Sequence, residues 1–232
     1  SFSTVYHQQL SYINYLYIIL DDTKFMSQNS DSQKLLLQTL HGKKSEETPI
    51  WLMRQAGRYL PEYRELRAKK GGFLKLCYDP ESAAEVTVQP IRRFGFDGSI
   101  LFSVILILPH AMGQDLWFEA GEGPRLSPRM VETALSSLTA APEHFEAIYA
   151  TVRKVASLLD DKTTFMGFAG SPWTIATYMV HGQGSKDQAV ARRYAYQDEI
   201  AFGELLKAII ANTLEYLLGQ IEAGVEAVQL FD

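Results

Sequence analysis

The chain has 232 residues, of which 47% are hydrophobic and 21% charged, a balance typical of a globular protein with a packed core. Its net charge of −5 disfavours a nucleic-acid partner, because nucleic-acid-binding proteins usually carry a basic face. The single cysteine, Cys77, excludes an internal disulfide and fits a reducing compartment. The five histidines show no paired metal-ligand spacing, so we expect no structural zinc site.

Residues 1–25 differ in character from the rest and are rich in tyrosine. Their apolar run, from Tyr12 to Leu20, lacks the basic flank of a signal peptide and is shorter than the roughly 20 residues that span a membrane. We expect residues 1–25 to be an extraneous or disordered upstream segment, with natural initiation at Met26. Residues 26–232 show no linker and no repeat, which predicts one domain and no membrane partner.

The first predicted elements alternate between helix and strand. A short helix at 34–40 is expected to end at Gly42, and the apolar run 50–53 is typical of a buried strand. Asp79 followed by Pro80 predicts the start of a helix that ends at Gly95 and is kinked or divided by Pro90.

The middle of the chain continues the alternation. Residues 98–103 are apolar throughout, as in a parallel strand buried on both faces. The glycines at 121 and 123 predict a turn, and the Ser-Pro and Pro-Glu pairs at 127–128 and 142–143 predict two helix starts. The second of these helices carries a core-facing stripe of apolar residues at helical spacing: Phe145, Ile148, Tyr149, Val152, Val155, Ala156 and Leu159.

The last predicted elements are a strand at 164–170, a helix from 171–172, a long helical region from Lys186 to Gly224 broken near Gln197, and a strand at 227–231. Alternating strands and helices predict an α/β fold with a parallel sheet. The chain ends at Asp232, directly after a strand. Because the loops after such strands carry the function, we expect this sequence to be truncated.

The segment from Pro49 to Arg67 carries the strongest functional signal. An apolar run ends at two arginines, Arg54 and Arg58, which bracket the small and flexible Gln55-Ala-Gly57. Arginine guanidinium groups bind carboxylates with two hydrogen bonds and stay charged at any working pH. The pattern therefore predicts a pocket for a small polyanion.

The block from Trp51 to Tyr63, Trp-Leu-Met-Arg-Gln-Ala-Gly-Arg-Tyr-Leu-Pro-Glu-Tyr, closely resembles the uroporphyrinogen decarboxylase family. The resemblance runs from about Lys34 to Asp232 without obvious gaps. Further matching blocks lie at residues 100–103, 109–113, 121–126, 167–174 and 229–232.

The resemblance implies a (β/α)8 TIM barrel, of which this chain covers roughly the first four βα units. It also implies a cytoplasmic homodimer that decarboxylates the four acetate side chains of uroporphyrinogen III to methyl groups without a cofactor or metal. Protonation of the adjacent pyrrole supplies the sink for the electrons left by CO2, and the protein stabilises the resulting cation in a shielded cleft.

Residue by residue, the resemblance implies that Arg54 and Arg58 bind substrate carboxylates and that one of them is a candidate proton donor. Gln55, Ala56 and Gly57 supply a close backbone approach between these arginines. Arg67 and Tyr178 match further substrate contacts, although Arg67 fits a surface salt bridge equally well and Tyr178 fits a packed helix tyrosine. His110 and His181 are read as lone histidines without a catalytic role, and Cys77 as a small buried hydrophobe.

Position 104 departs from the family. Where the family carries an aspartate that faces the pyrrole N–H groups, this sequence has Val104. Valine has neither a charge nor a hydrogen-bond acceptor, and losing such a contact typically costs roughly 100- to 1,000-fold in rate. A sequencing error would give the same residue, because the two codons differ by one base.

Two hypotheses follow from these features. In the first, the natural full-length protein is a uroporphyrinogen decarboxylase. In the second, the chain is an inactive fragment or degenerate paralogue that at most binds porphyrinogen or an intact subunit. A methyltransferase on the same barrel is disfavoured, because such proteins lack the Arg-Gln-Ala-Gly-Arg block. We expect the chain as given to have negligible activity.

Overall fold

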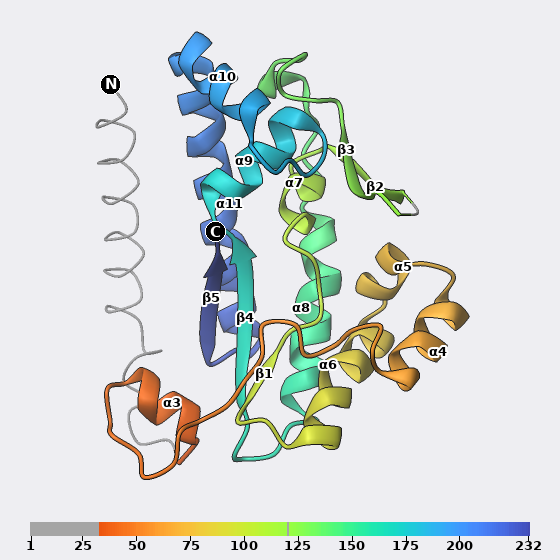
Figure 1. The fold of residues 1–232 in the computed structure, drawn as a ribbon, viewed down its shortest axis with the longest axis vertical. Helices are drawn as coiled ribbons and strands as arrows, with labels where there is room; N and C mark the ends of the chain where they lie inside the picture. The colour runs from red at the N-terminus through yellow and green to blue at the C-terminus, as the bar shows by residue number, and fades with distance from the viewer. Residues whose placement is uncertain (1–32, 120) are drawn as a thin grey trace.

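The computed structural model describes residues 33–119 and 121–232, so the expectations for residues 1–25 and the start at Met26 lie outside the described residues. Three parallel strands form the central sheet in the order β1 (Gly98–Ile100), β4 (Thr164–Gly170) and β5 (Ala227–Phe231). Figure 1 shows them side by side, with their carboxyl ends pointing the same way. The α/β class with a parallel sheet is confirmed, and the last two strands have the predicted bounds.

Helices connect and cover these strands, and most of those predicted are present. They are α3 (Leu35–Leu40), α4 (Pro61–Lys70), α5 (Phe73–Cys77), α6 (Pro80–Phe94), α7 (Ile107–Ala111), α8 (Glu143–Ala156), α9 (Pro172–His181), α10 (Ala189–Gln197) and α11 (Glu199–Ala223). The break predicted near Gln197 separates α10 from α11. Helix α6 is continuous through Pro90 rather than divided.

Helix ends follow the local chemistry of the sequence. The Asp79 carboxylate caps α6 by accepting a hydrogen bond from the Ser82 N–H at 2.9 Å, and Gly95 ends this helix with a φ of +66°. The Asp198 side chain caps α11 in the same way, by accepting from the Ala201 N–H at 2.9 Å. The two helices therefore begin and end where their capping residues allow.

The predicted strand at 50–53 is wrong. This segment forms no ladder and ends in a turn at Met53, and Ile50, Leu52 and Met53 are 55%, 48% and 60% exposed. Its backbone pairs with the sheet through the Asp97 N–H, which donates to the Ile50 carbonyl at 2.9 Å. The hydrogen bonds to β1 itself come from the side chain of Gln55. An apolar run predicts that a segment is extended, but not that a neighbouring backbone pairs with it.

The helix predicted from Ser127-Pro128 is also wrong. The chain forms an antiparallel hairpin there, with β2 (Asp115–Glu119) and β3 (Gly123–Ser127) joined by the predicted turn at Gly121. Beyond the hairpin only a short 3-10 turn, η1 (Leu135–Ser137), precedes α8. The backbone instead docks on the end of α9: the Leu126 N–H donates to the Gly182 carbonyl at 2.8 Å, and the Met130 N–H donates to the Met179 carbonyl at 2.9 Å.

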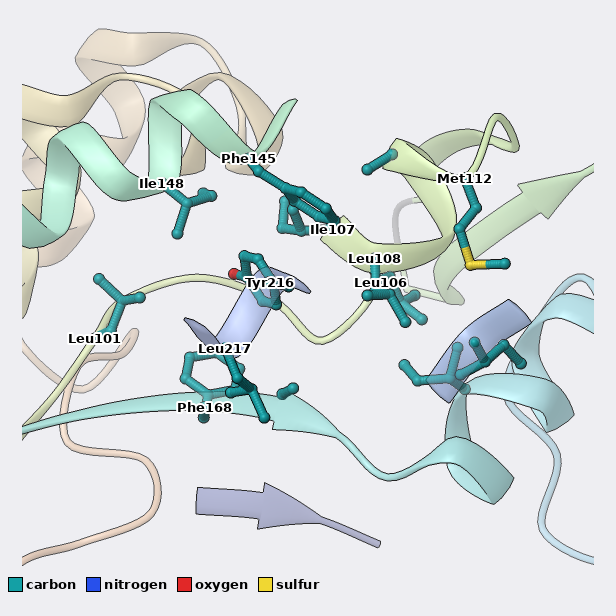
Figure 2. Packing of buried hydrophobic residues seen from close by; sticks show 14 of the residues in the cluster. Leu101, Leu106, Ile107, Leu108, Met112, Phe145, Ile148, Phe168, Tyr216 and Leu217 are labelled. Atoms are coloured by element: carbon teal, nitrogen blue, oxygen red, sulfur yellow. The ribbon is translucent and has the colours of Figure 1, made fainter. Parts of the chain in front are cut away.

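The main hydrophobic core lies between the sheet and the helices α7, α8, α9 and α11. The stripe on α8 is largely buried as predicted, through Phe145, Ile148, Val152 and Val155. Figure 2 shows Tyr216 and Leu217 of α11 between the segment that follows β1 and strand β4. The core therefore fills the space between the sheet and these helices.

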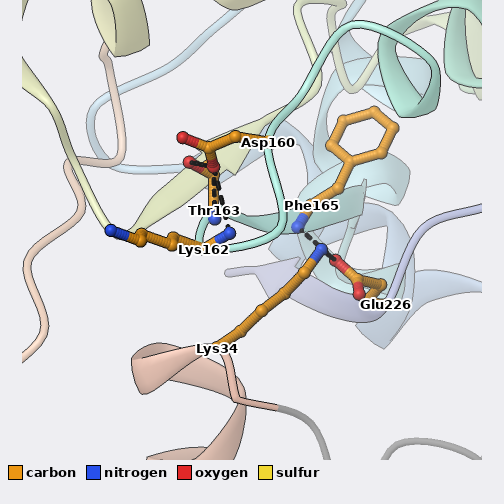
Figure 3. Close-up of polar contacts among 6 residues, drawn as sticks. All are labelled: Lys34, Asp160, Lys162, Thr163, Phe165 and Glu226. Carbon is orange, nitrogen blue, oxygen red and sulfur yellow. Dashed lines mark hydrogen bonds and ion pairs between the residues drawn. The ribbon is translucent and has the colours of Figure 1, made fainter.

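An ion pair ties α3 to the amino ends of the strands (Figure 3). The Lys34 ammonium lies 2.7 Å from Oε2 of Glu226, and the same oxygen accepts a hydrogen bond from the Phe165 N–H at 2.9 Å. Because both side chains are mostly buried, this contact is screened less by salt than a surface pair. The opposite, carboxyl-terminal ends of the strands point toward α9 (Figure 1).

Candidate functional site

The carboxyl ends of β4 and β5 meet at the start of α9. The Ser171 N–H donates to the Phe231 carbonyl at 2.7 Å, and the Thr174 hydroxyl donates to the Asp232 carboxylate at 3.0 Å. In parallel α/β folds this edge carries the ligand site. A carboxylate and two hydroxyl side chains are therefore gathered where such a site is expected.

Val104 follows the carboxyl end of β1 and lies at the same edge. Its side chain is half-buried and packs against the main core, and its carbonyl accepts a hydrogen bond from the Ile107 N–H at 3.1 Å, which starts α7. The next residue, Ile105, lies against Gly170 at the end of β4. Position 104 thus has a fixed backbone at the strand ends, but its side chain brings no charge.

The arginine loop, which we define as residues 54–58, runs beside β1. Arg54 and Arg58 are exposed, whereas Gln55 between them is only 1% exposed. The Gln55 amide donates to the Gly98 carbonyl at 2.6 Å and accepts from the Ile100 N–H at 3.1 Å. Ala56 and Gly57 are half-buried. The loop therefore presents two guanidinium groups to solvent from a side-chain anchor on the sheet.

Arg67 and Tyr63 both lie on α4, and Arg58 precedes this helix. The Arg67 guanidinium is 5.5 Å from the centroid of the Phe73 ring, a cation–π contact. Burial raises the pKa of the Tyr63 hydroxyl, and the positive charges of Arg67 and Arg58 oppose this rise. The positive charges of both arginines therefore act on the Tyr63 hydroxyl.

An aromatic cluster that the sequence did not predict forms the floor beneath Arg67. The Phe73 ring packs edge-on against Phe102 at 5.7 Å and against Phe118 of the hairpin at 4.7 Å, and Tyr63 packs against Phe102 at 5.7 Å between centroids. These rings come from α4, α5, the segment after β1, and β2. The only local signal was the Gly71-Gly72 pair, which predicts a turn before Phe73.

Tyr178 belongs to a different part of the molecule. It lies on α9, packs against the main core, and its ring is close to Gly184, where an added Cβ would be 3.4 Å from its hydroxyl. Helix α9 packs against α10, α11, α7 and β3, whereas α4 with Arg67 packs against α5 and α6. The charges of Arg58 and Arg67 both act on Tyr63, whereas Tyr178 lies among a different set of helices.

His110 is not the isolated histidine that the sequence suggested. Its ring stacks on that of His144 with 3.9 Å between centroids, and its Nδ1 lies 2.7 Å from the Tyr78 hydroxyl. Burial lowers the pKa of His110, the charge of His144 lowers it further, and Asp115 opposes the change. Cys77, by contrast, is the buried small hydrophobe that was predicted: it is fully buried, and burial raises its thiol pKa.

Two negative findings concern metals and membranes. Among residues 33–119 and 121–232, the structure has no group of three or more His, Cys, Asp or Glu side chains arranged to hold a metal ion. In the same part of the chain, no helix is both long enough and apolar enough to cross a membrane.

Comparison with solved structures supports the fold. A methyltransferase from Methanosarcina mazei superposes with a TM-score of 0.64 over 83% of this chain and 56% of that chain, at 14% identity. A likeness at this identity shows the fold alone. The described part of the chain is a portion of a barrel of the (β/α)8 type, in which three of the four predicted strands are formed.

Comparison of sequences identifies the family. The chain is 69% identical over 201 residues to a uroporphyrinogen decarboxylase of Sphingopyxis alaskensis and 65% identical over 198 residues to one of Erythrobacter litoralis. These matches cover 87% and 85% of this chain, and the chain spans only 59% and 58% of the length of these relatives. The model of the uroporphyrinogen decarboxylase family matches residues 31–232, and the chain therefore belongs to that family.

Proposed function

We propose that the protein represented by this chain decarboxylates uroporphyrinogen to coproporphyrinogen in porphyrin biosynthesis. The observation that carries the proposal is the arginine loop, in which the exposed Arg54 and Arg58 flank the buried Gln55 anchor, in a chain of this family. Uroporphyrinogen has eight carboxylates, so its binding site needs several fixed cations, and arginine serves this purpose better than lysine.

In this proposal, the arginine loop and Arg67 bind and orient the carboxylates. One of the loop arginines is the candidate proton donor to the pyrrole next to the acetate that is lost. Ala56 and Gly57 allow close approach of the backbone, and Tyr178 contacts another part of the large macrocycle from α9. The aromatic floor below Arg67 excludes water, which strengthens the electrostatic contacts made above it.

Position 104 would hold the group that stabilises the pyrrole cation. Val104 cannot provide that stabilisation, so we propose that catalysis by this chain is slow compared with an otherwise equal chain carrying aspartate at 104. The proposal further includes residues 26–232 as one domain, a cytoplasmic location, and a homodimer that works without a metal or cofactor.

The test supplies the purified protein with uroporphyrinogen under reducing, oxygen-free conditions and measures CO2 release and coproporphyrinogen formation. Uroporphyrin binding is measured in parallel by fluorescence. We expect binding to weaken by about tenfold or more in Arg58→Ala or Arg67→Ala, because each change removes a charge-assisted contact. Arg93→Ala is the matched control, since Arg93 makes a surface ion pair with Glu62 at 3.0 Å.

The outcomes separate the two hypotheses. Binding that depends on Arg58 and Arg67, together with slow CO2 release, supports the proposed reaction. Binding without any CO2 release, even after Val104→Asp, supports a chain that only binds porphyrinogen. Binding that is equally strong in all three alanine variants contradicts the proposed site.

A further inference from the structure

The Gln55 side chain takes the place of a strand backbone at the free edge of β1. Its amide nitrogen donates to the Gly98 carbonyl at 2.6 Å, and its amide oxygen accepts from the Ile100 N–H at 3.1 Å. A neighbouring strand would bond these two backbone groups in the same way. The side chain is 1% exposed, so both hydrogen bonds are shielded from water.

A second glutamine in the chain uses the same device. Gln220 of α11 is fully buried, and its amide accepts from the Phe168 N–H and donates to the Phe168 carbonyl, both at 3.0 Å. These groups of β4 lie beyond the last hydrogen bond from the β1 side, in which the Leu101 N–H donates to Met166. No arginine flanks Gln220 in the sequence. Gln220 therefore makes the same kind of side-chain-to-strand hydrogen bonds outside the proposed site.

Gln55 also fixes the arginine loop internally. The Tyr59 hydroxyl donates to the Gln55 carbonyl, and the Leu60 N–H donates to the Gly57 carbonyl at 3.0 Å. Arg54 and Arg58 flank this anchor and are themselves exposed. The loop is thus attached to β1 by a side chain that sits between the two guanidinium groups.

We propose that Gln55 is a positioning residue: its side-chain amide holds the arginine loop against β1 and so sets the spacing of Arg54 and Arg58. Gln55 itself does not touch the ligand through its side chain, because both polar atoms of that side chain are bonded to β1. Holding these two charges in place before binding lowers the cost of ordering them around a polycarboxylate. The part that concerns the ligand rests on the proposed function, whereas the anchoring does not.

The decisive variant is Gln55→Glu, because its protonation state switches the donor on and off. A protonated glutamic acid donates to Gly98 and accepts from Ile100, as glutamine does. The ionised form only accepts, and it turns a negative charge toward the Gly98 carbonyl. Burial raises the pKa of this carboxyl above its usual value of about 4.3, so the switch falls within the range in which the protein can be studied.

Other titratable or charged groups near this position are the same in both proteins. They are Arg54, Arg58 and Tyr59 on the loop side, Arg93 of α6 and Glu62 of α4, whose charges act on Tyr59, and Asp97 before β1, whose carboxylate accepts from the Ile50 N–H at 2.7 Å. Expressing each result as a ratio to wild type at the same pH therefore isolates residue 55. Gln55→Met, which has a similar shape and no amide, removes both hydrogen bonds at every pH, and Gln220→Met is its matched control.

The first measurement is hydrogen exchange of the backbone amides of residues 53–60, which needs no ligand. From about pH 5 to about pH 8 we expect Gln55→Glu to change from wild-type exchange to exchange about tenfold faster. Gln55→Met should exchange faster throughout, and Gln220→Met should leave this segment unchanged. If Gln55→Met does not fold, the pH comparison within Gln55→Glu still decides the matter.

Exchange in Gln55→Glu that stays at the wild-type rate at every pH, or that is equally fast at every pH, overturns the proposal. The second measurement is uroporphyrin binding, for which we expect about tenfold weaker affinity at the higher pH and recovery at the lower. A pH switch in exchange with no uroporphyrin binding, even by wild type, would retain the anchoring and reject the proposed function. Unaltered binding despite faster exchange would overturn the positioning role.

Discussion

Tyr78, His110 and His144 join three separate segments at a titratable cluster. The Tyr78 hydroxyl contacts His110 Nδ1 at 2.7 Å, and burial raises the pKa of Tyr78, which keeps its proton available for that contact. The neighbouring His144 ring and burial both lower the pKa of His110, so this imidazole is held in its neutral form. Such a group links the stability of the fold to pH.

We predict that the free energy of unfolding declines on acidification through this cluster. The pKa of His110 is lower in the folded chain than its value of about 6.5 in the unfolded chain. Its full contribution is present above about pH 6.5 and is lost as the pH falls toward the folded pKa. Because solvent screens part of the His110 side chain, we expect this contribution to the free energy of unfolding to be less than about 1 kcal/mol.

Urea unfolding at several pH values measures this contribution. His110→Gln should flatten the decline, since glutamine accepts from Tyr78 but does not titrate. His41→Gln, at the end of α3, serves as the control and should keep the wild-type slope. An unchanged slope in His110→Gln would show that the decline has another origin.

Val104 gives the clearest prediction about activity. Val104→Asp is expected to raise turnover by about 100-fold, because a carboxylate at this strand end would stabilise the pyrrole cation of the proposed reaction. Val104→Asn separates charge from hydrogen bonding: it accepts hydrogen bonds without a full charge and should recover only a small part. Steady-state rates with uroporphyrinogen make the comparison, and equal turnover by the valine and aspartate proteins would contradict it.

Single residues show what a sequence motif can and cannot predict. The arginine block identified Arg54, Arg58 and Arg67 as candidates, and the structure leaves Arg54 and Arg58 exposed on either side of the buried Gln55. It did not predict that Gln55 is buried, because that depends on a free strand edge 43 residues away in the chain. His110 was read as isolated for the same reason, since its partners lie far from it in sequence.

At the scale of elements, Gln220 bonds the edge of β4, and its replacement measures how much a side-chain amide contributes to the free energy of unfolding. Gln220→Met would leave the N–H and carbonyl of Phe168 buried without partners, at about 1–3 kcal/mol for each group. We expect the free energy of unfolding in urea to fall by about 2–4 kcal/mol.

Gln197→Met, at the exposed end of α10, is the control for this change and should stay within about 0.5 kcal/mol of wild type. Gly167 permits the close approach of the Gln220 amide, because an added Cβ would collide with its oxygen. A loss in Gln220→Met no larger than in the control would mean that water replaces the amide.

The elements also differ in how well local sequence specifies them. Strands β4 and β5 were predicted with the correct bounds, because both are mostly apolar runs with local boundary signals, Pro172 after β4 and Gly224 before β5. The apolar run at 50–53 has the same local signature but lacks a ladder, and the segment at 128 docks on α9 instead of starting a helix. In both places a long-range partner decides the outcome.

At the scale of the whole molecule, apolar side chains gather on the surface beside β1. Five of them, which we call the edge patch, are between 48% and 60% exposed: Ile50, Leu52, Met53, Tyr59 and Phe94. Tyr59 and Phe94 stack with 6.3 Å between ring centroids, which joins the residue after the arginine loop to the end of α6. Exposed apolar patches and free strand edges favour association with other molecules.

We therefore predict that the chain self-associates through the edge patch as its concentration rises. Leu52→Glu places a charge in the middle of the patch and should lower light scattering and shift sedimentation toward the monomer. Leu158→Glu is a control of matched exposure, because Leu158 is 46% exposed, against 48% for Leu52, and follows α8 rather than belonging to the five residues of the patch. The added charge is the same in both proteins, so an equal decrease in both would indicate general repulsion rather than a specific contact. Only a decrease confined to Leu52→Glu assigns the association to the segment that failed to form a strand.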